Sequence, residues 1–506
     1  VNSDSNNAVT ETPARLAEAQ QAGDQSIVLL KNDTTTKGTK LLPLRVPHAG
    51  SFKVAVIGFY ANPPTMYLGG YASTQGPAGI AKEVNGYQGL KTAIQGIDPQ
   101  AQVDWLPGVT GTGLDTVDQA SVAAAANYDA VIVYAGTDQT TGTEGVDRSS
   151  LALPGAQASL ISQVAAANPN TIAYLETMGE VDVTGFAQNV PALLWSSYNG
   201  QRKGASLADV VLGTANPSGK LPFSWYADVN QLPPTTSYDI RPTATTPGRT
   251  YMYFTGAQSY PFGYGGSYTT FRYSDLRVDG AHPDANDTIH VSAEVTNTGP
   301  VAGDDVAQIY VTTPNAPAAL QRPIKRLEAF QKIALRPHQT KHVDFTIKIP
   351  NLAFFNETTN TFQVDDGMYG IQLSSSAANS DIEQQQFVTV TGQLRPTPSV
   401  VTAQPVAPGD AAAHVAQRVM FPTGTTVDPQ LTVSLSDESL FGYITAGAST
   451  PLPSGMTVHY RGNRPNVVSI DRNGVIHTVG SGVATVTATV EYHGRTAQGS
   501  FVVDVQ

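Results

Sequence analysis

Four charged side chains lie close together in the segment from Ala135 to Gly155, and three of them are carboxylates: Asp138, Glu144, Asp147 and Arg148. A carboxyl group can donate a proton to a reacting atom or accept one from it, and a carboxylate beside a guanidinium can instead form an ion pair. The segment follows an apolar run and precedes a helical pattern, so we predict a loop that leaves the end of a β-strand.

Four short runs rich in apolar and β-branched residues predict the strands that must position this loop. They cover residues 53–58, 130–136, 171–176 and 191–197, and helical patterns such as 154–167 lie between them. Strands that alternate with helices predict a largely parallel sheet covered by helices on both faces. Ligands of such sheets meet the loops at the carboxyl ends of the strands, which is where the charged loop begins.

The first residues, 1–12, are polar and are predicted to be a linker that leads into a short helix. Thr12 has the side chain of a helix N-cap, and Pro13 suits the first helical position because the N–H that it lacks would have no partner there. We therefore expect an α/β sandwich domain over residues 1–247, with the linker at its start.

The hydrophobic period changes after a Tyr- and Gly-rich connection that begins at Gly248. Apolar and polar residues then alternate between turns, which predicts a β-sandwich from Tyr273 to Gly392. The expected order is this connection and sandwich over 248–392, a Pro-rich linker over 393–411 and a second all-β module over 412–506. The fold class is therefore multidomain, α/β followed by all-β.

The composition excludes several classes of partner and chemistry. The 506-residue chain has 29 Lys and Arg against 41 Asp and Glu and a net charge of −12, which argues against nucleic acid because its phosphates require clustered basic residues. Cysteine is absent, so disulfides, thiolate metal sites and Cys nucleophiles are excluded. No apolar run approaches the roughly 18 residues of a membrane-spanning helix.

Four ordered blocks of the sequence resemble family-3 glycoside hydrolases. They are "SIVLLKND" with "LLPL" (26–44), "GTDQTTGTEGVDRSSLALPGAQASLI" (136–161), "GQRKGASLADVVLGTANPSGKLPFSW" (200–225), and "GRTYMYF" with "YPFGYGGSYTTFRYSDL" (248–276). Because the blocks keep their order over about residues 10–390, the resemblance is more specific than any one motif.

In the resembling family a (β/α)8 barrel usually precedes an α/β sandwich and a fibronectin type III-like domain. This chain resembles the family from the sandwich onward and has no eightfold βα pattern. The resemblance therefore implies that a barrel with the aspartate nucleophile lies on a missing segment or a separate chain. Assembly of the protein into a homodimer is a further open alternative. "YSDL" (273–276) looks like a nucleophile motif, but it matches the entry to the fibronectin-like domain, so we expect Asp275 to be structural.

The resemblance also gives the charged loop a role, since the family takes its general acid/base from this loop and that glutamate falls on Glu144. Retaining hydrolysis needs one carboxylate to attack the anomeric carbon and a second, about 5 to 5.5 Å away, to protonate the departing oxygen and later deprotonate water. Gly145 is expected to turn the backbone so that this carboxylate enters the cleft, and Asp147 and Arg148 are expected to pair and fix the loop. A solvated loop carboxylate is the alternative for Glu144. Xylosidase-type and plant members often carry a further Glu where this chain has Gly142.

The segment "MYLGGYAS" (66–73) resembles the M-x-G-x-Y segment of the β-xylosidase branch, in which the tyrosine approaches the sugar. Tyr71 is therefore the candidate for substrate binding, with packing against the barrel as the alternative. The resemblance favours an exo-acting β-xylosidase on nonreducing-end sugars; β-glucosidase is the rival and α-L-arabinofuranosidase a companion activity. Two carboxylates suffice for acetal cleavage, so we expect no cofactor and no metal.

The final module, with "RPNVVSIDRNGVIHTVGSGVATVTAT" (464–489), resembles a bacterial immunoglobulin-like group 2 domain. Together the two resemblances imply an exported carbohydrate-active enzyme, secreted or at the cell surface. A noncatalytic carbohydrate-binding or cell-surface protein is the alternative from another class. The retained loop with Glu144 argues against that alternative.

Overall fold

The computed structural model describes residues 11–506 apart from 36–37, 49, 73–76, 235, 357–360, 395–396, 407–419, 436–439 and 445–451. The chain divides into two compact units. One comprises Val1–Arg277, Ser292–Phe345 and Gly370–Gln386, and the other comprises Val278–Val291, Thr346–Tyr369 and Phe387–Gln506. The linker expected over 1–12 lies almost wholly outside the described residues.

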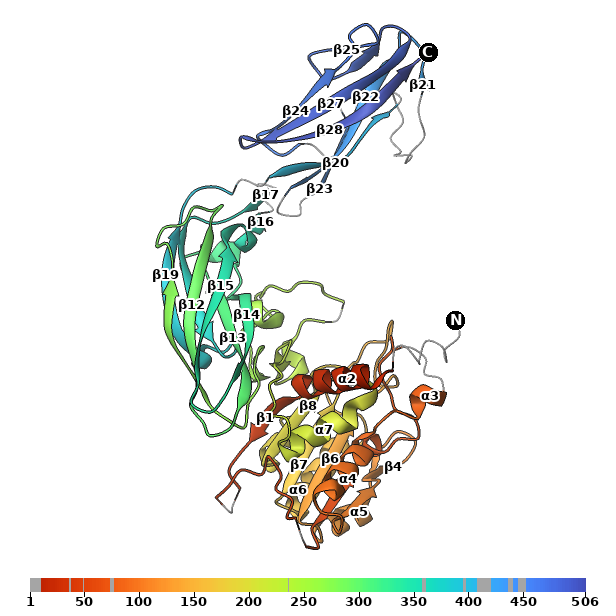
Figure 1. Ribbon diagram of the computed structural model, residues 1–506, viewed down its shortest axis with the longest axis vertical. Helices are drawn as coiled ribbons and strands as arrows, with labels where there is room; N and C mark the ends of the chain where they lie inside the picture. Colours follow the sequence, from red (N-terminus) through yellow and green to blue (C-terminus); the bar gives the residue numbers. More distant parts are fainter. Residues whose placement is uncertain are drawn as a thin grey trace. The chain divides into compact units, whose positions relative to one another are not determined.

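The first unit contains a six-stranded sheet in the order β1-β8-β7-β6-β2-β3 (Figure 1). All neighbouring strands are parallel except β1, which pairs antiparallel with β8 at one edge. Every residue of β6 and β7 is buried, as expected for central strands that are covered on both faces. The strands are β1 (Val28–Asn32), β2 (Lys53–Ile57), β3 (Gln102–Leu106), β6 (Ala130–Gly136), β7 (Thr171–Glu176) and β8 (Ala192–Ser196).

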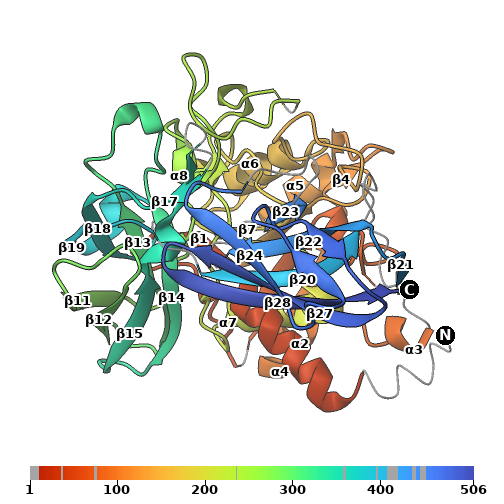
Figure 2. The ribbon, with the colours of Figure 1, turned by 90° about the horizontal axis from the view of Figure 1, so that it is seen from above.

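Helices cover both faces of this sheet, and the prediction of a largely parallel, doubly covered sheet is confirmed. α2 (Pro13–Ser26), α4 (Gly86–Ile97) and α7 (Lys203–Leu212) lie side by side on one face (Figures 1 and 2). α5 (Gln119–Ala125) and α6 (Gln157–Ala167) supply apolar side chains to the core on the other face. The short elements of this part are α3 (Pro77–Ile80), β4 (Val109–Thr110), β5 (Thr116–Val117), β9 (Trp225–Tyr226), α8 (Thr250–Tyr253) and β10 (Gln258–Tyr260).

The first helix begins as the sequence predicts. The Thr12 hydroxyl accepts a hydrogen bond from the backbone N–H of Arg15 (3.4 Å), and Pro13 occupies the first turn. Gly23 of this helix is buried, and a Cβ placed on it would lie 2.3 Å from the Ser206 hydroxyl of α7. The two helices therefore pack closely at this point.

Asp24 of α2 lies near this contact, and ionising its carboxyl group in the folded protein costs free energy that can be measured. Burial and the nearby Asp209 raise the pKa of Asp24 to about 6, and one of its carboxylate oxygens is buried without a hydrogen-bond partner. A carboxyl group with a raised folded-state pKa is protonated more readily in the folded than in the unfolded chain, so stability falls as the pH rises from about 4 to about 6. We expect Asp24→Asn to raise the free energy of unfolding at pH 7 by about 1 kcal/mol, which is less than the full pKa shift corresponds to because solvent screens this half-buried group.

Urea denaturation of wild type and Asp24→Asn at pH 4 and pH 7 checks this expectation. The two proteins should be close in stability at pH 4 and separate at pH 7. An Asp24→Asn variant that is less stable than wild type at pH 7 would show that the charged carboxylate is favourable there.

The strands between Phe271 and Val390 form two sheets, and their residues show the alternating burial expected of a β-sandwich. One sheet has the order β11-β12-β15 and the other β14-β13-β18-β19. Asp275 is an exposed residue of β11, so it belongs to a strand of these sheets, as expected for a structural residue. The strands are β11 (Phe271–Val278), β12 (Thr288–Asn297), β13 (Gly303–Thr312), β14 (Arg326–Leu335), β15 (Thr340–Lys348), β16 (Phe354–Asn356), β17 (Thr361–Gln363), β18 (Gly367–Ser374) and β19 (Ile382–Val390).

The C-terminal strands form a second pair of sheets, with the orders β20-β22-β26-β25 and β21-β28-β27-β24, and β23 pairs with β22. Their bounds are β20 (Pro398–Val406), β21 (Met420–Phe421), β22 (Thr426–Leu435), β23 (Leu440–Ile444), β24 (Met456–Gly462), β25 (Val468–Ile470), β26 (Ile476–Thr478), β27 (Gly482–Tyr492) and β28 (Arg495–Val505).

The linker predicted over 393–411 is wrong for its central part. Residues 398–406 form β20, which pairs antiparallel with β22 from Pro398 opposite Leu435 to Val406 opposite Asp428. The prolines suggested a linker, but β20 stands at the end of its sheet order, and an edge strand tolerates proline because one of its sides needs no ladder hydrogen bonds.

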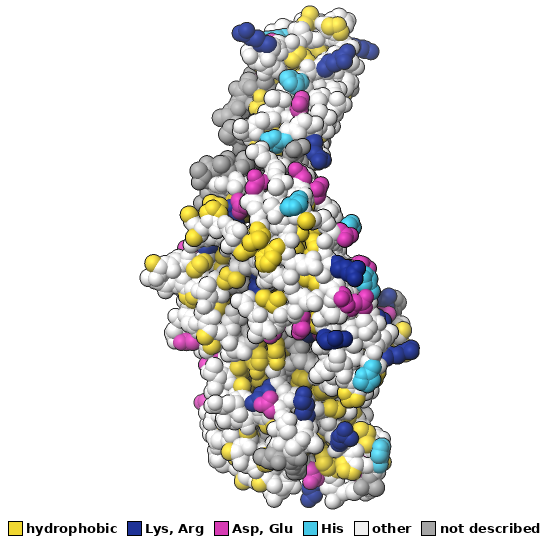
Figure 3. All heavy atoms as spheres, turned by 90° about the vertical axis from the view of Figure 1, so that its left-hand side faces the viewer, with side chains coloured by type: hydrophobic (Ala, Val, Ile, Leu, Met, Phe, Trp, Pro, Cys, Tyr) yellow, Lys and Arg dark blue, Asp and Glu magenta, His cyan; other side chains and the backbone are white. Residues whose placement is uncertain are grey.

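Acidic and basic side chains are interspersed on the molecular face shown in Figure 3, in agreement with the absence of a basic stripe from the sequence. No helix among the described residues is both long and apolar enough to cross a membrane.

Candidate active site

The charged loop leaves the carboxyl end of β6, and Glu144 occupies its tip. The backbone N–H of Thr143 donates to the Val146 carbonyl (3.1 Å), and the N–H of Val146 donates to the Thr143 carbonyl (2.9 Å). Glu144 and Gly145 are the two residues of the resulting hairpin turn. Gly145 has a φ of +76°, a left-handed conformation that favours glycine, so the backbone turns at this residue. That the turn directs the Glu144 carboxylate into a cleft stays a prediction.

The structure brings together the two residues that the sequence singled out. A hydrogen bond to Glu144 raises the pKa of the Tyr71 hydroxyl, so the phenol donates to the carboxylate. Tyr71 is 85% exposed and the Glu144 side chain is also exposed, so both groups can be reached from solvent. A carboxyl group that is open to solvent at this edge of the sheet can exchange a proton with a reacting group.

The segment that carries Tyr71 also contacts the hairpin through its backbone. A Cβ placed on Gly70 would lie 3.8 Å from the Thr143 hydroxyl and 3.8 Å from the Tyr67 hydroxyl. The ring of Tyr67 meets that of Tyr198 edge-on at 4.8 Å between centroids. Tyr67 and Tyr198 therefore pack against each other beside the glycines that precede Tyr71, and neither was predicted from the sequence.

Tyr198 follows the end of β8, and its neighbours follow the ends of adjacent strands. Its hydroxyl shares a hydrogen bond of 2.8 Å with the Thr137 hydroxyl, which in turn accepts from the Met178 N–H (3.0 Å). Burial raises the pKa of Tyr198 above its usual range, so this phenol stays protonated near neutral pH. The rule that sites form at the carboxyl ends of parallel strands could have identified Tyr198.

Asp138 is held within the loop by its own neighbours. One of its oxygens accepts from the N–H (2.8 Å) and the hydroxyl (2.6 Å) of Thr140, and the other accepts from the Tyr60 hydroxyl (3.2 Å). The carboxylate thus closes a turn at the start of the loop. This arrangement gives Asp138 a structural role and leaves Glu144 as the exposed carboxylate at the hairpin tip.

The predicted ion pair between Asp147 and Arg148 is wrong. Within the described part of the chain no ion pair joins them, and Arg148 instead donates from Nη1 to the Glu180 carbonyl (2.8 Å). The long Arg148 side chain reaches the loop that follows β7. The arginine still fixes the loop, but through a backbone carbonyl.

The side chain of Arg148 also limits the space beside Gly142. A Cβ on Gly142 would lie 3.2 Å from the Met178 sulfur and 3.3 Å from Cγ of Arg148. Both contacts are tighter than ordinary packing, so a glutamate here would require its neighbours to move. Glu144, in contrast, stands exposed at the tip of the hairpin.

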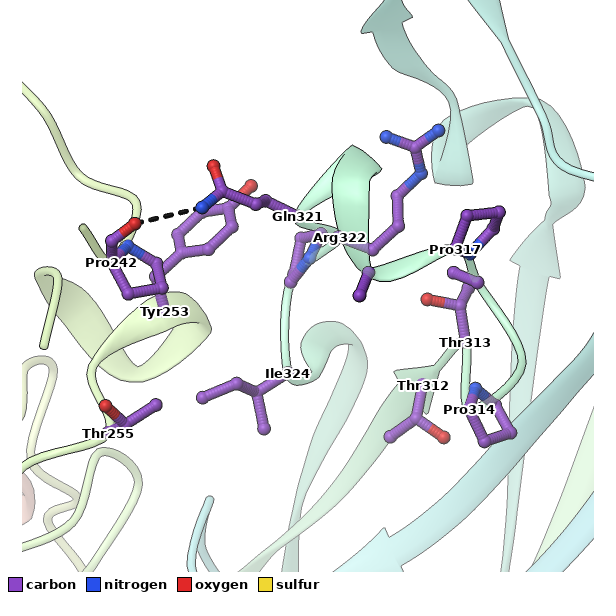
Figure 4. Close-up of a pocket in the computed structure, with 13 residues that line it drawn as sticks. Pro242, Tyr253, Thr255, Thr312, Thr313, Pro314, Pro317, Gln321, Arg322 and Ile324 are labelled. Atoms are coloured by element: carbon purple, nitrogen blue, oxygen red, sulfur yellow. Dashed lines mark hydrogen bonds between the residues drawn. The ribbon is translucent and has the colours of Figure 1, made fainter. Parts of the chain in front are cut away.

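The described residues contain no group of three or more His, Cys, Asp or Glu side chains that could hold a metal ion. A cavity of about 410 Å³ lies elsewhere in the first unit, between the 242–255 segment and the 312–324 loop (Figure 4). Its wall includes four prolines, and the Arg322 guanidinium points away from it. No carboxylate lines this cavity, so it adds nothing to the proton chemistry of Glu144.

Comparison with known proteins identifies two parts of the chain. Residues 27–268 match the glycosyl hydrolase family 3 C-terminal domain, and residues 305–377 match the fibronectin type III-like domain. The Glu144 hairpin and Tyr71 both lie within the first match.

Similar proteins include glycosidases with several specificities. A β-xylosidase from Formosa agariphila is 33% identical over 371 residues, which are 72% of this chain and 49% of that protein. An exo-α-(1→6)-L-arabinopyranosidase from Bifidobacterium breve is 34% identical over 75% of this chain and 49% of that protein. The solved family-3 β-glucosidase of Bifidobacterium adolescentis has a TM-score of 0.62 and 31% identity, covering 74% of this chain and 53% of that chain.

The chain thus spans about half the length of the curated relatives it matches. The two matches fall on the α/β part and on the sandwich strands described above. Residues 27–268 are a family-3 glycosyl hydrolase C-terminal domain, and residues 305–377 are a fibronectin type III-like domain.

Proposed function

We propose that this chain supplies the general acid/base of a retaining, exo-acting β-glycosidase, with Glu144 as the proton-transferring residue. The observation that carries the proposal is the position of Glu144, exposed at the tip of a hairpin at the carboxyl edge of the sheet and hydrogen-bonded by Tyr71. The names of the similar proteins, which include β-xylosidase and β-glucosidase, support the reaction class.

In the proposed mechanism a carboxylate on a barrel portion attacks the anomeric carbon while the Glu144 carboxyl protonates the departing oxygen. The resulting Glu144 carboxylate then takes a proton from a water molecule whose oxygen attacks the anomeric carbon. This attack breaks the bond to the barrel carboxylate and releases the sugar with its original configuration. The barrel portion lies on another segment or a separate chain in this proposal. Two carboxylates complete both steps, so the proposal assigns no cofactor.

The favoured substrates are β-xylosides at nonreducing ends, and β-glucosides are the alternative. The M-x-G-x-Y resemblance around Tyr71 and the β-xylosidase names among the relatives support xylose. The ratio of kcat/KM for aryl β-xyloside and aryl β-glucoside, measured on the complete enzyme, decides between the two sugars. A complete enzyme that hydrolyses neither, yet binds oligosaccharides, would support the noncatalytic alternative.

The proposal predicts that the 506-residue chain alone does not turn over an aryl β-glycoside. Glu144 can move protons, but the attacking carboxylate and most sugar contacts are assigned to the barrel portion. Release of nitrophenol should therefore appear only when that portion is present. The control is the complete enzyme at equal concentration, and turnover by the isolated chain would contradict the proposal.

We further propose that the C-terminal strands are a bacterial immunoglobulin-like domain for attachment or spacing in a secreted or cell-surface protein. The resemblance of residues 464–489 and the strands that they contribute support this assignment. Deleting residues 398–506 from the complete enzyme should change kcat/KM for an aryl glycoside by less than about twofold, because the proposal assigns the proton chemistry to residues of the first unit. The deletion should begin at 398, since β20 pairs with β22. Loss of turnover in a deletion variant that is still folded would assign this part a direct role.

A further inference from the structure

A buried ion pair lies below the candidate site. Glu176, the last residue of β7, accepts from Nζ of Lys203, the first residue of α7, at 2.5 Å, and the two side chains are only 4% and 6% exposed. The Tyr134 hydroxyl donates to the second oxygen of Glu176. Removing two charges from water is costly, so a buried pair is weak evidence for stability and calls for another reason.

The lysine makes one further contact, and it points toward the site. Nζ of Lys203 donates to the backbone carbonyl of Tyr67 at 2.8 Å. The residues from Met66 to Gly69 have no regular secondary structure, so the backbone there depends on side-chain contacts for its position. Lys203 is thus a direct link between the packed sheet and the irregular segment that carries Tyr71.

The segment continues from this anchor to Glu144 through a short series of contacts. The Tyr67 ring packs edge-on against Tyr198, Gly70 approaches Thr143 of the hairpin, and Tyr71 donates to Glu144. Each contact joins neighbouring residues, so a shift of the Tyr67 carbonyl would be transmitted to the Tyr71 side chain.

We propose that Glu176 and Lys203 are positioning residues: the buried pair holds the Tyr67 carbonyl and so sets the Tyr71 hydroxyl against the Glu144 carboxylate. Glu176 orients the lysine side chain, and the Tyr134 hydroxyl orients Glu176. The inference rests on the proposed function only where it treats Glu144 as the acid/base. The alternative is that the pair stabilises the junction of β7 and α7 without effect on Tyr71.

A second buried pair in the same unit provides a matched control. Nζ of Lys220 lies 2.8 Å from Asp305 and also donates to a backbone carbonyl, that of Gly265, at 2.8 Å. Lys220 therefore has the same chemistry as Lys203, a buried carboxylate partner plus a main-chain acceptor. Among the described residues, the hydrogen-bond and ion-pair partners of Lys220 lie outside the 66–71 segment.

The test measures the ionisation of Tyr71 in the 506-residue chain. The protein is labelled with 3-fluorotyrosine, the Tyr71 signal in the 19F NMR spectrum is assigned by its loss in Tyr71→Phe, and its pH titration is followed. Glu144→Gln gives the reference titration for Tyr71 without its carboxylate partner. The variants are Lys203→Met, the charge-neutral pair Lys203→Met with Glu176→Gln, and the control Lys220→Met.

We expect both Lys203 variants to lower the apparent pKa of fluorinated Tyr71 to the value measured in Glu144→Gln, while Lys220→Met keeps the wild-type value. The charge-neutral pair leaves no buried charge unpaired, so it reports on positioning even if Lys203→Met alone does not fold. A wild-type Tyr71 titration in the folded charge-neutral variant overturns the inference. The measurement needs no turnover, so a failure of the proposed enzyme activity would be seen separately.

Discussion

Replacing Glu144 by glutamine in the complete enzyme will slow the hydrolysis of natural disaccharides by about 10²- to 10⁴-fold, the usual cost of losing general acid/base catalysis. The glutamine side chain has nearly the same shape but cannot donate or accept the transferred proton. Tyr71 can still donate to the amide oxygen, so the hairpin should keep its position. The loss should appear in kcat, measured by release of reducing sugar at saturating substrate.

The form of the defect is more diagnostic than its size. An aryl glycoside with an acidic leaving group needs little protonation, so Glu144→Gln should still form the glycosyl-enzyme and then stall because no base activates water. Added azide attacks without a base and should restore turnover with the β-glycosyl azide as product, since two inversions preserve the configuration.

Asp147→Asn is the matched control for this experiment, because it removes another exposed carboxylate of the same loop. This variant should show neither the dependence on the leaving group nor the rescue by azide, and neither should Asp138→Asn. Wild-type rates on disaccharides in Glu144→Gln would place the acid/base elsewhere and remove the main support for the proposed function.

Replacing Gly204 by alanine will destabilise the first unit by at least about 3 kcal/mol and will leave little soluble protein. A Cβ on Gly204 of α7 would lie 1.8 Å from the backbone carbonyl oxygen of Asn85, and one on Gly89 of α4 would lie 2.0 Å from the carbonyl oxygen of Gly204. The obstructing atoms belong to the backbone, so no side-chain rotation can relieve the clash. The two helices would have to separate along their contact.

Gly96→Ala is the control for this prediction, because Gly96 also lies in α4 but has no atom near the position of its missing Cβ. An alanine there should stabilise the protein by about 0.5 to 1 kcal/mol through its greater helix propensity. Chemical denaturation of both variants gives the comparison. If Gly204→Ala unfolds at the same denaturant concentration as wild type, the helix contact is looser than the structure shows.

Much of the fold could be predicted from the sequence because its signals are local. The apolar run that forms β6 and the amphipathic pattern of α6 each lie within a few residues, and the Thr12 cap depends on one hydrogen bond to its own helix. The hairpin at Glu144 could be predicted for the same reason, because Gly145 favours a turn through its own conformational freedom.

The features that the sequence did not reveal depend on partners far away in the chain. Arg148 donates a hydrogen bond to the carbonyl of Glu180. Lys203 pairs with Glu176 because the first residue of α7 lies at the carboxyl end of β7. β20 was missed because the proline signal is local, whereas its pairing with β22 depends on the sheet order. Composition and periodicity carry no information about such pairs.

The antiparallel edge strand has a consequence for the order of events during protein synthesis. Val28 of β1 pairs with Trp195 of β8, so β1 cannot join the sheet until β8 has left the ribosome. At about 5–20 residues per second, the apolar strand that includes Leu29 and Leu30 waits on the order of ten seconds or more for its partner. The nascent chain must therefore keep this apolar segment from pairing with other strands over that time.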